Sequence, residues 1–172
     1  MKNLILIGMP GTGKSAVGKE LARRLEYTFL DVDDVIRERT GKTLKELLEE
    51  GGVDAFIRLE GKIGESLTLE DTVIATGGSM VLSAGAMDHL RENGVTVWLE
   101  TPLHEIEDRM PQDLWDRGIA ARRDATIRQI YEERSPLYAR YADVIVASQQ
   151  GEDATAQQVE QVMRTVGMSL KD

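Results

Sequence analysis

Apolar and polar positions along the chain form blocks that are typical of short buried strands and amphipathic helices. Short, mostly apolar runs predict strands at residues 4–7, 28–32, 72–75, 95–99 and 143–146. Apolar residues repeated every three or four positions predict helices at residues 14–24, 34–40, 44–50, 53–69, 84–92, 103–110, 125–138 and 154–166. The alternation of strands with helices predicts an α/β fold, with a parallel sheet covered by helices on both faces.

The segment 111–123 shows no clear periodicity. It contains Pro111, Trp115 and Gly118 among residues of mixed charge. Loops of about 12 residues are uncommon in compact domains unless they have a function. Two interpretations stay open: a mobile loop that closes over a site, or an ordinary surface connection.

Composition restricts the class of protein. The 172 residues contain no repeat or linker, so residues 1–172 are expected to form one domain. The net charge of −9 argues against a broad nucleic-acid surface, which needs clustered Lys and Arg. The chain has no Cys for a disulfide or a thiolate metal site, and no apolar run of the roughly 18 residues that a membrane span needs. We therefore expect a cytoplasmic monomer that binds neither nucleic acid nor a membrane.

A glycine-rich sequence separates the first predicted strand from the first predicted helix. Gly8-Met9-Pro10-Gly11-Thr12-Gly13-Lys14-Ser15 matches G-x-x-x-x-G-K-[ST], the phosphate-binding loop. In such a loop, backbone N–H groups surround a polyphosphate, Lys14 contacts the β and γ phosphates, and Ser15 ligates Mg²⁺. The sequence therefore predicts a site for a nucleoside triphosphate and Mg²⁺.

Carboxylates follow the second predicted strand. Strand alternation places Asp31 and Asp33 on the same side of the chain, at the sheet edge where ligands bind in parallel α/β folds. Such a pair suits the support of Mg²⁺ and the orientation or deprotonation of an acceptor hydroxyl. The alternative is helix capping, for which Asp34 is the expected residue.

Two further groups of residues suit a phosphoryl-transfer site. Gly77, Gly78 and Ser79 follow the third predicted strand, where paired glycines allow close approach of a ligand or simply form a tight turn. Arginines can neutralise the charge of a transferring phosphoryl group, although most arginines are solvated. The candidates are Arg109, Arg117, Arg122, Arg123 and Arg134.

In this order and spacing, the motifs resemble those of the shikimate kinases, small P-loop kinases, over nearly the whole chain. The matching positions are residues 8–15, 29–33 (F-x-D-x-D), 40–43, 77–78 and 133–138 (E-R-x-P-L-Y), with Phe56, Glu60 and Arg117. The phosphate loop is shared by many families, whereas the F-x-D-x-D and R-x-P-L-Y elements are much more specific.

The resemblance implies a three-layer P-loop kinase fold with a five-stranded parallel sheet of order 2-3-1-4-5. It also implies an acceptor-binding region near residues 34–61 and a lid near residues 111–123. The implied reaction is ATP-dependent, Mg²⁺-requiring phosphoryl transfer to a hydroxyl of a small hydroxy acid. For shikimate the product is 3-phosphoshikimate, an intermediate of aromatic amino-acid biosynthesis.

The resemblance also implies roles for individual residues. Lys14, Asp33 and Arg117 are the expected catalytic residues. Nucleotide binding is expected at Gly11, Thr12, Gly13, Lys14, Ser15, Ala16 and Arg109. Acceptor binding is expected at Asp33, Gly77, Gly78, Ser79 and Arg134, and Mg²⁺ binding at Ser15 and Asp31.

Three positions depart from the family pattern. The family arginine that follows Phe56 and binds the carboxylate of shikimate is Ile57 here, and the adjacent Arg58 should face elsewhere, since one helical residue turns about 100°. Ser79 replaces a third glycine, which should narrow or rearrange the acceptor loop. Gly118 replaces a proline after the lid arginine.

Three readings of function therefore stay open. In the first, the acceptor is shikimate and Arg134 alone holds its carboxylate. In the second, the acceptor is a different small hydroxy acid, such as homoserine. A nucleotide-binding regulator without transfer chemistry is disfavoured, because Lys14, Ser15, Asp31 and Asp33 are all retained.

Overall fold

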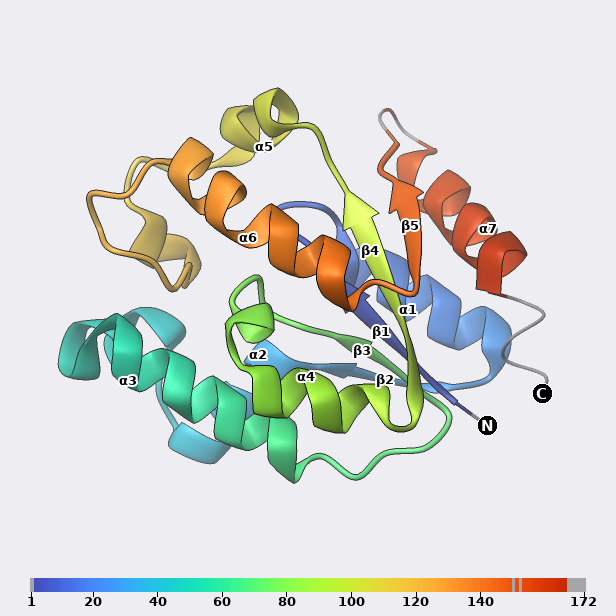
Figure 1. Cartoon of the computed structure of the whole chain (residues 1–172), viewed down its shortest axis with the longest axis horizontal. Coiled ribbons are helices and arrows are strands. Elements are labelled where there is room, and N and C mark those ends of the chain that lie inside the picture. Colours follow the sequence, from blue (N-terminus) through green and yellow to red (C-terminus); the bar gives the residue numbers. More distant parts are fainter. Residues whose placement is uncertain (1, 150, 152, 167–172) are drawn as a thin grey trace.

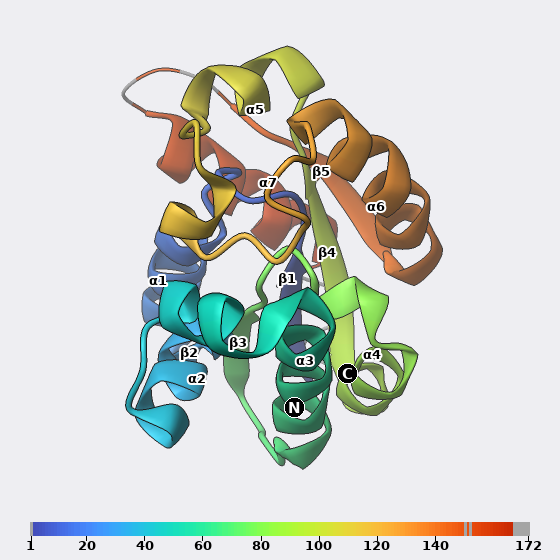
Figure 2. The same ribbon diagram turned by 90° about the vertical axis from the view of Figure 1, so that its left-hand side faces the viewer.

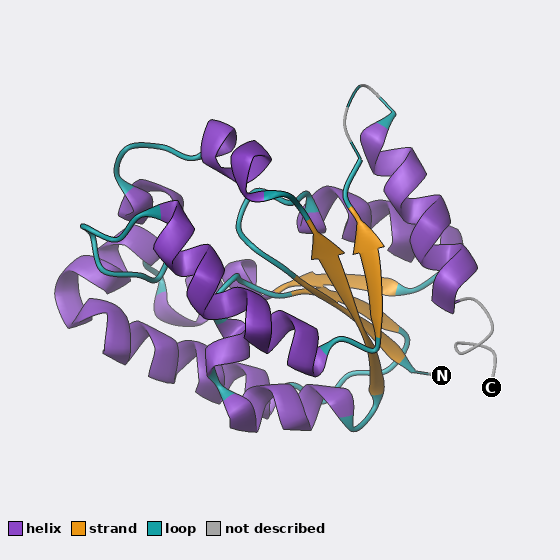
Figure 3. Cartoon of the chain, turned by 45° about the horizontal axis from the view of Figure 1, so that its top comes forward, coloured by secondary structure: helices purple, strands orange, loops and turns teal. Residues whose placement is uncertain are grey.

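The computed structural model describes residues 2–149, 151 and 153–166, so residues 1, 150, 152 and 167–172 of the predicted domain lie outside the described residues. Five parallel strands form one sheet in the order β2-β3-β1-β4-β5, which confirms the predicted order (Figures 1 and 3). The strands are β1 Asn3–Ile7, β2 Thr28–Asp31, β3 Thr72–Ala75, β4 Gly94–Glu100 and β5 Val144–Ala147. The α-helices are α1 Lys14–Leu25, α2 Val32–Thr40, α3 Leu44–Ser66, α4 Ala84–Arg91, α5 Leu103–Arg109, α6 Ile127–Tyr141 and α7 Ala154–Val166, and the 3-10 helices are η1 Met80–Leu82 and η2 Leu114–Arg117.

The sheet has a hydrophobic core on each face, so the molecule has three layers. Leu4 and Leu6 of β1 pack with apolar residues of α1 and α7 on one face. Ile5 and Ile7 pack with residues of α2, α3, α4 and α6 on the other face (Figure 1). Because β1 is buried on both sides, its residues 4–7 are continuously apolar instead of alternating.

The carboxyl ends of the three strands β1, β2 and β3 meet at one edge of the sheet. Ala75 of β3 is in register with Leu6 of β1 and with Asp31 of β2. Thr76, directly after β3, donates from its hydroxyl to the carbonyl of Leu6 at 2.8 Å. The segments that follow the three strands therefore lie side by side at this edge.

The start of α2 corrects two predictions. Val32 was predicted in the second strand, but α2 already begins at Val32, so Asp31 and Asp33 line the same pocket through the turn into α2 and not through strand alternation. The Asp31 carboxylate accepts from the backbone N–H of Asp33 at 2.9 Å, so Asp31 caps the helix instead of Asp34. A cap that satisfies a free amide of the first helical turn outweighs the preference of one valine for a strand.

The predicted helices 44–50 and 53–69 form a single bent helix, α3. Gly52 interrupts its helical geometry with φ 80° and ψ 177°, a conformation that only glycine adopts readily. The helix ends at Ser66, three residues earlier than predicted. In the described part of the chain, not even this long helix is apolar enough to cross a membrane.

The segment 111–123 contains the short helix η2, which the sequence pattern did not predict. Asp113 caps η2, and Gly118 ends it in the left-handed conformation at φ 69°. Figure 2 shows this segment beside α3, and ion pairs join Asp116 to Lys45 and Arg123 to Glu49 across that contact. Proline cannot adopt φ 69°, which explains why glycine suits position 118 in this chain.

Candidate active site

A pocket of about 500 Å³ lies where the ends of β1, β2 and β3 face α3, the segment 111–123 and α6. Its volume is typical of a small-molecule site, about 300–1,000 Å³. Most of the residues that the sequence nominated line this pocket: Gly11, Gly13, Lys14, Ser15, Ala16, Asp31, Asp33, Gly77, Gly78, Ser79, Arg117 and Arg134. Thr12 and Arg109 lie outside its lining.

Lys14 is buried at the start of α1. Its Nζ donates to the carbonyls of Gly8 and Met9, both at 2.8 Å. Burial lowers the pKa of Lys14 to about 8, because desolvation disfavours the charged form. The residue before it, Gly13, is left-handed at φ 88° and forms no side-chain cap, so the first N–H groups of α1 can bind an anion.

Thr12 and Arg109 contact the phosphate loop from outside the pocket. The Thr12 side chain is buried, and its Oγ1 lies 3.5 Å from the Nζ of Lys14. Arg109, at the end of α5, donates to the carbonyl of Gly11 at 2.7 Å. The structure therefore gives both residues contacts that stabilise the loop.

Ser15 and Asp31 are in direct contact. The Ser15 hydroxyl donates to Oδ2 of Asp31 at 2.7 Å, while Oδ1 of Asp31 accepts the capping hydrogen bond of α2. A hydroxyl and a carboxylate at this spacing fit Mg²⁺, which commonly takes one or two carboxylates together with phosphate oxygens and waters. Within the described residues, no group of three or more His, Cys, Asp or Glu side chains is arranged to hold a metal without such additional ligands.

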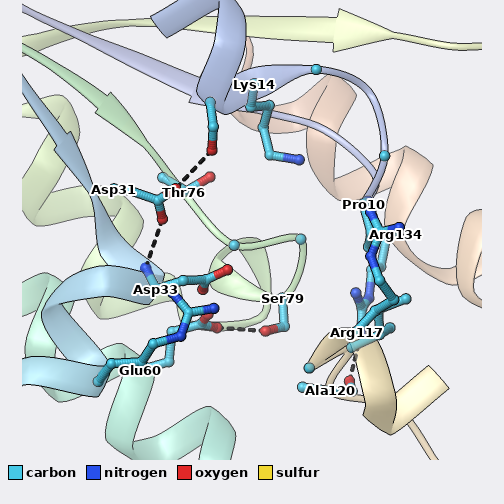
Figure 4. A pocket seen from close by; sticks show the side chains of 18 of the residues that line it. Pro10, Lys14, Asp31, Asp33, Glu60, Thr76, Ser79, Arg117, Ala120 and Arg134 are labelled. Carbon is cyan, nitrogen blue, oxygen red and sulfur yellow. Dashed lines mark hydrogen bonds between the residues drawn. The ribbon is translucent and has the colours of Figure 1, made fainter. Parts of the chain in front are cut away.

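Acidic side chains form one wall of the pocket (Figure 4). Burial and the neighbouring Asp31 carboxylate raise the pKa of Asp33 to about 6. Burial raises the pKa of Glu60 to about 7, although Ser79 donates to its Oε1 at 2.6 Å and favours the ionised form. A side chain at position 77 would meet Oε2 of Glu60 at 2.7 Å and Oδ1 of Asp33 at 3.1 Å, so Gly77 brings both carboxyl groups close to the backbone.

Arginines form the facing wall, as Figure 4 shows for Arg117 and Arg134. The buried Arg134 of α6 donates from Nη2 to the carbonyl of Ala120 at 2.6 Å. Its Nε has no hydrogen-bond partner among the described residues. One turn later on α6, the Tyr138 hydroxyl donates to the carbonyl of Gly78 at 2.7 Å, which ties the glycine loop to the same helix.

The structure explains how this chain departs from the family pattern in the acceptor region. Ile57 is half-buried against the core and does not line the pocket. Arg58 is exposed and also lies outside the lining, as its helical position predicted. The hydroxyl of Ser79, which a glycine would lack, donates to Oε1 of Glu60 at 2.6 Å and so connects the glycine-rich loop to α3.

Among the charged and aromatic residues at the site, Glu60, Arg37 and Tyr138 were assigned no role from the sequence. Glu60 and Arg37 line the pocket, and Tyr138 supports it from behind. Helical spacing could have indicated two of them, since Arg37 follows Asp33 and Tyr138 follows Arg134 by four positions. Glu60 matches a position of the family pattern, but its burial beside Ser79 depends on the packing of α3 and gave no basis for a role.

The sequence matches the model of the shikimate kinase family over residues 10–166. The chain belongs to the shikimate kinase family. A shikimate kinase of Sulfurihydrogenibium sp. is 37% identical over 139 residues, which cover 80% of this chain and 83% of the relative. A shikimate kinase of Microcystis aeruginosa is 35% identical over 173 residues, which cover 99% of this chain and 89% of the relative.

Solved shikimate kinases have the same fold. The shikimate kinase of Acinetobacter baumannii, solved in complex with shikimate, superimposes with a TM-score of 0.81 at 27% identity and covers 98% of this chain and 94% of that chain. The shikimate kinase of Aquifex aeolicus gives a TM-score of 0.81 at 29% identity, with 97% of each chain covered. Family membership, fold and pocket thus agree on an ATP-using phosphotransferase that acts on a hydroxyl group.

Proposed function

We propose that this chain transfers the γ-phosphoryl group of ATP to a hydroxyl of shikimate, which gives 3-phosphoshikimate and ADP. The observation that carries the proposal is one pocket that holds the phosphate loop, Asp33 and Arg134 together. Those three features correspond to a phosphoryl donor site, a proton acceptor and a carboxylate site. The complex of the Acinetobacter baumannii relative with shikimate supports the choice of acceptor.

On the donor side, Lys14 and the free N–H groups at the start of α1 would bind the phosphates. Mg²⁺ bound by Ser15 and Asp31 would supply positive charge that offsets the charge of the phosphate oxygens. Arg117 lies on the segment 111–123, so movement of that segment can bring a further cation to the transferring group and exclude water.

On the acceptor side, Asp33 would accept the proton of the attacking hydroxyl. The hydroxyl oxygen forms a bond to the γ phosphorus, the bond from that phosphorus to the β–γ bridging oxygen breaks, and ADP retains the bond's electron pair. A pKa of about 6 keeps most of the Asp33 carboxyl ionised at pH 7, while it is more basic than an ordinary aspartate. Arg134 would hold the carboxylate of shikimate at the facing wall.

The described residues of a single chain supply every group in this scheme, which supports a monomeric enzyme. We also propose that it acts in the cytoplasm, where ATP is present, and the absence of Cys is compatible with a reducing compartment. Its partners would then be small molecules only.

A panel assay tests the proposal. Purified protein is given MgATP with shikimate, homoserine, gluconate or a nucleoside monophosphate, and ADP release and the phosphorylated acceptor are both measured. We expect turnover with shikimate and a loss of about 10²- to 10⁴-fold in Asp33→Asn, since a positioned general base contributes about that much. Turnover of homoserine without turnover of shikimate would replace the proposed acceptor, and the absence of ADP release with every acid would contradict a kinase.

A further inference from the structure

Helix α2 carries a cation into the pocket one turn after Asp33. Arg37 lines the same pocket, and residues four apart lie on the same face of a helix. Arg37 therefore lies on the same side of α2 as Asp33, the residue that would receive the proton of the acceptor hydroxyl, and both residues line the pocket.

The partner of Arg37 in the structure is exchangeable. Its Nη1 lies 2.9 Å from Oδ1 of Asp34, and the two side chains are 48% and 71% exposed. Exposed pairs of this kind contribute little to stability, so an anion in the pocket can compete for the guanidinium. An arginine can then bind a carboxylate through two parallel hydrogen bonds.

A cation on the wall formed by Asp33 and Glu60 would favour the binding of an acceptor carboxylate. Asp33 and Glu60 would repel the carboxylate of an acceptor, and Lys14 is bound to carbonyls of the phosphate loop. Ile57 has no charge, and Arg58 does not line the pocket. Among the described residues that line the pocket, Arg37 is the arginine carried by the acidic wall, opposite Arg134 and Arg117.

We propose that Arg37 is a second carboxylate-binding residue of the acceptor pocket and leaves Asp34 for the acceptor when the acceptor binds. The inference rests on the proposed function, since it assumes an acceptor that carries a carboxylate. Helix α2 would thus supply the positive charge that Ile57 of α3 does not provide.

The first test is Arg37→Gln, with Arg39→Gln as the matched control. Arg39 lies on the same helix, outside the pocket, and donates to Ser66. We expect Arg37→Gln to raise the KM for shikimate about 10- to 100-fold, as the loss of a charge-assisted hydrogen bond does. The KM for ATP should change less than about 3-fold, and Arg39→Gln should match the wild-type protein. Arg37→Lys should recover part of the loss, because lysine keeps the charge but not the planar fork.

The second test removes the charge from the acceptor. With the methyl ester of shikimate, wild type and Arg37→Gln should bind almost equally, since the ester offers no carboxylate for Arg37. Calorimetric binding of acid and ester to the two proteins measures this difference without turnover. Equal weakening of acid and ester would overturn the proposal, as would an increase in the KM for ATP alone or a shift of the pH profile alone.

These outcomes are distinct from failure of the proposed function. If wild type phosphorylates another hydroxy acid, shikimate is the wrong acceptor, while Arg37 is judged on that acid and its ester. If wild type binds none of the acids in the panel, both proposals are overturned.

Discussion

At the scale of single residues, Glu60 is a buried carboxyl group, and the hydrogen bond from Ser79 offsets only part of the cost of burying its charge. Its hydrogen bond from Ser79 favours the ionised form, yet burial dominates and raises the pKa to about 7. A carboxyl whose pKa is higher in the folded state than the ordinary 4.5 binds its proton more tightly there. Its stabilising contribution is therefore fully present below about pH 4.5 and is lost as the pH rises through about 7.

Glu60→Gln should stabilise the free protein at alkaline pH. Glutamine is neutral at every pH and can still accept the hydrogen bond of Ser79, so the desolvation cost of the carboxylate disappears. We expect a gain of about 1–3 kcal/mol in the free energy of unfolding at pH 8, from about 1.4 kcal/mol per pKa unit, and almost no gain near pH 4.5. Urea denaturation at the two pH values measures the gain.

Glu38→Gln is the control for this substitution, because Glu38 is exposed on α2. It should leave the free energy of unfolding almost unchanged at both pH values. A loss of stability in Glu60→Gln at pH 8 would show that the ionised carboxylate is stabilised by the pocket and that burial does not dominate.

At the scale of elements, Gly118 connects η2 to α3. Its φ of 69° disfavours any side chain, and a Cβ at this position would lie 2.7 Å from atoms of Leu44 at the start of α3. Gly41 offers a matched comparison, because it has the same φ of 69° and nothing within 4 Å of the added Cβ. Comparing substitutions at Gly118 and Gly41 therefore distinguishes the effect of backbone strain, which both share, from the effect of the contact with α3, which only Gly118 makes.

Gly118→Ala should impair catalysis, whereas Gly41→Ala should affect stability alone. Both substitutions should cost about 1 kcal/mol in the free energy of unfolding from the left-handed backbone. Only Gly118→Ala should push the segment that carries Arg117 away from α3. We expect the kcat/KM of this variant to fall about 10-fold or more, since small misplacements of catalytic groups have effects of this order. Steady-state kinetics and urea denaturation of both variants measure the effects, and equal kinetics would contradict a role for this contact.

The sequence predicted local features of these elements well and features set by distant contacts poorly. The apolar strands and the phosphate loop follow from nearby residues, so their existence was predicted correctly, whereas the order of the strands in the sheet came from the family resemblance. The start of α2 was wrong because the competition between Asp31 and Asp34 for the cap depends on the direction in which the chain leaves β2. Arg37 was missed, and Glu60 was matched to the family pattern without a role, because their place in the pocket depends on how α2 and α3 pack together.

At the scale of the whole molecule, both cores share the sheet. The core with α1 and α7 and the core with α2, α3, α4 and α6 lie on opposite faces of the same strands (Figure 3). The pocket is bounded by the phosphate loop, by α2 and α3, and by α6, so ligands contact segments that belong to both layers of helices. Each core covers one face of β1, so the loss of either core would expose apolar side chains of the strand that the other core also needs.

This arrangement predicts a single unfolding transition that ligands shift as a unit. ADP at 100 times its dissociation constant should raise the free energy of unfolding by about 2.7 kcal/mol, and Tm by roughly 5–10 °C for a chain of this size. Lys14→Met should lose most of the ADP shift while shikimate still raises Tm, because Lys14 would contact phosphate and Arg134 the acceptor. Lys19→Met, the same substitution at an exposed position of α1, should keep both shifts. Scanning calorimetry distinguishes the outcomes: two separate transitions would contradict the predicted single domain, and an undiminished ADP shift in Lys14→Met would contradict the assignment of Lys14 to the phosphates.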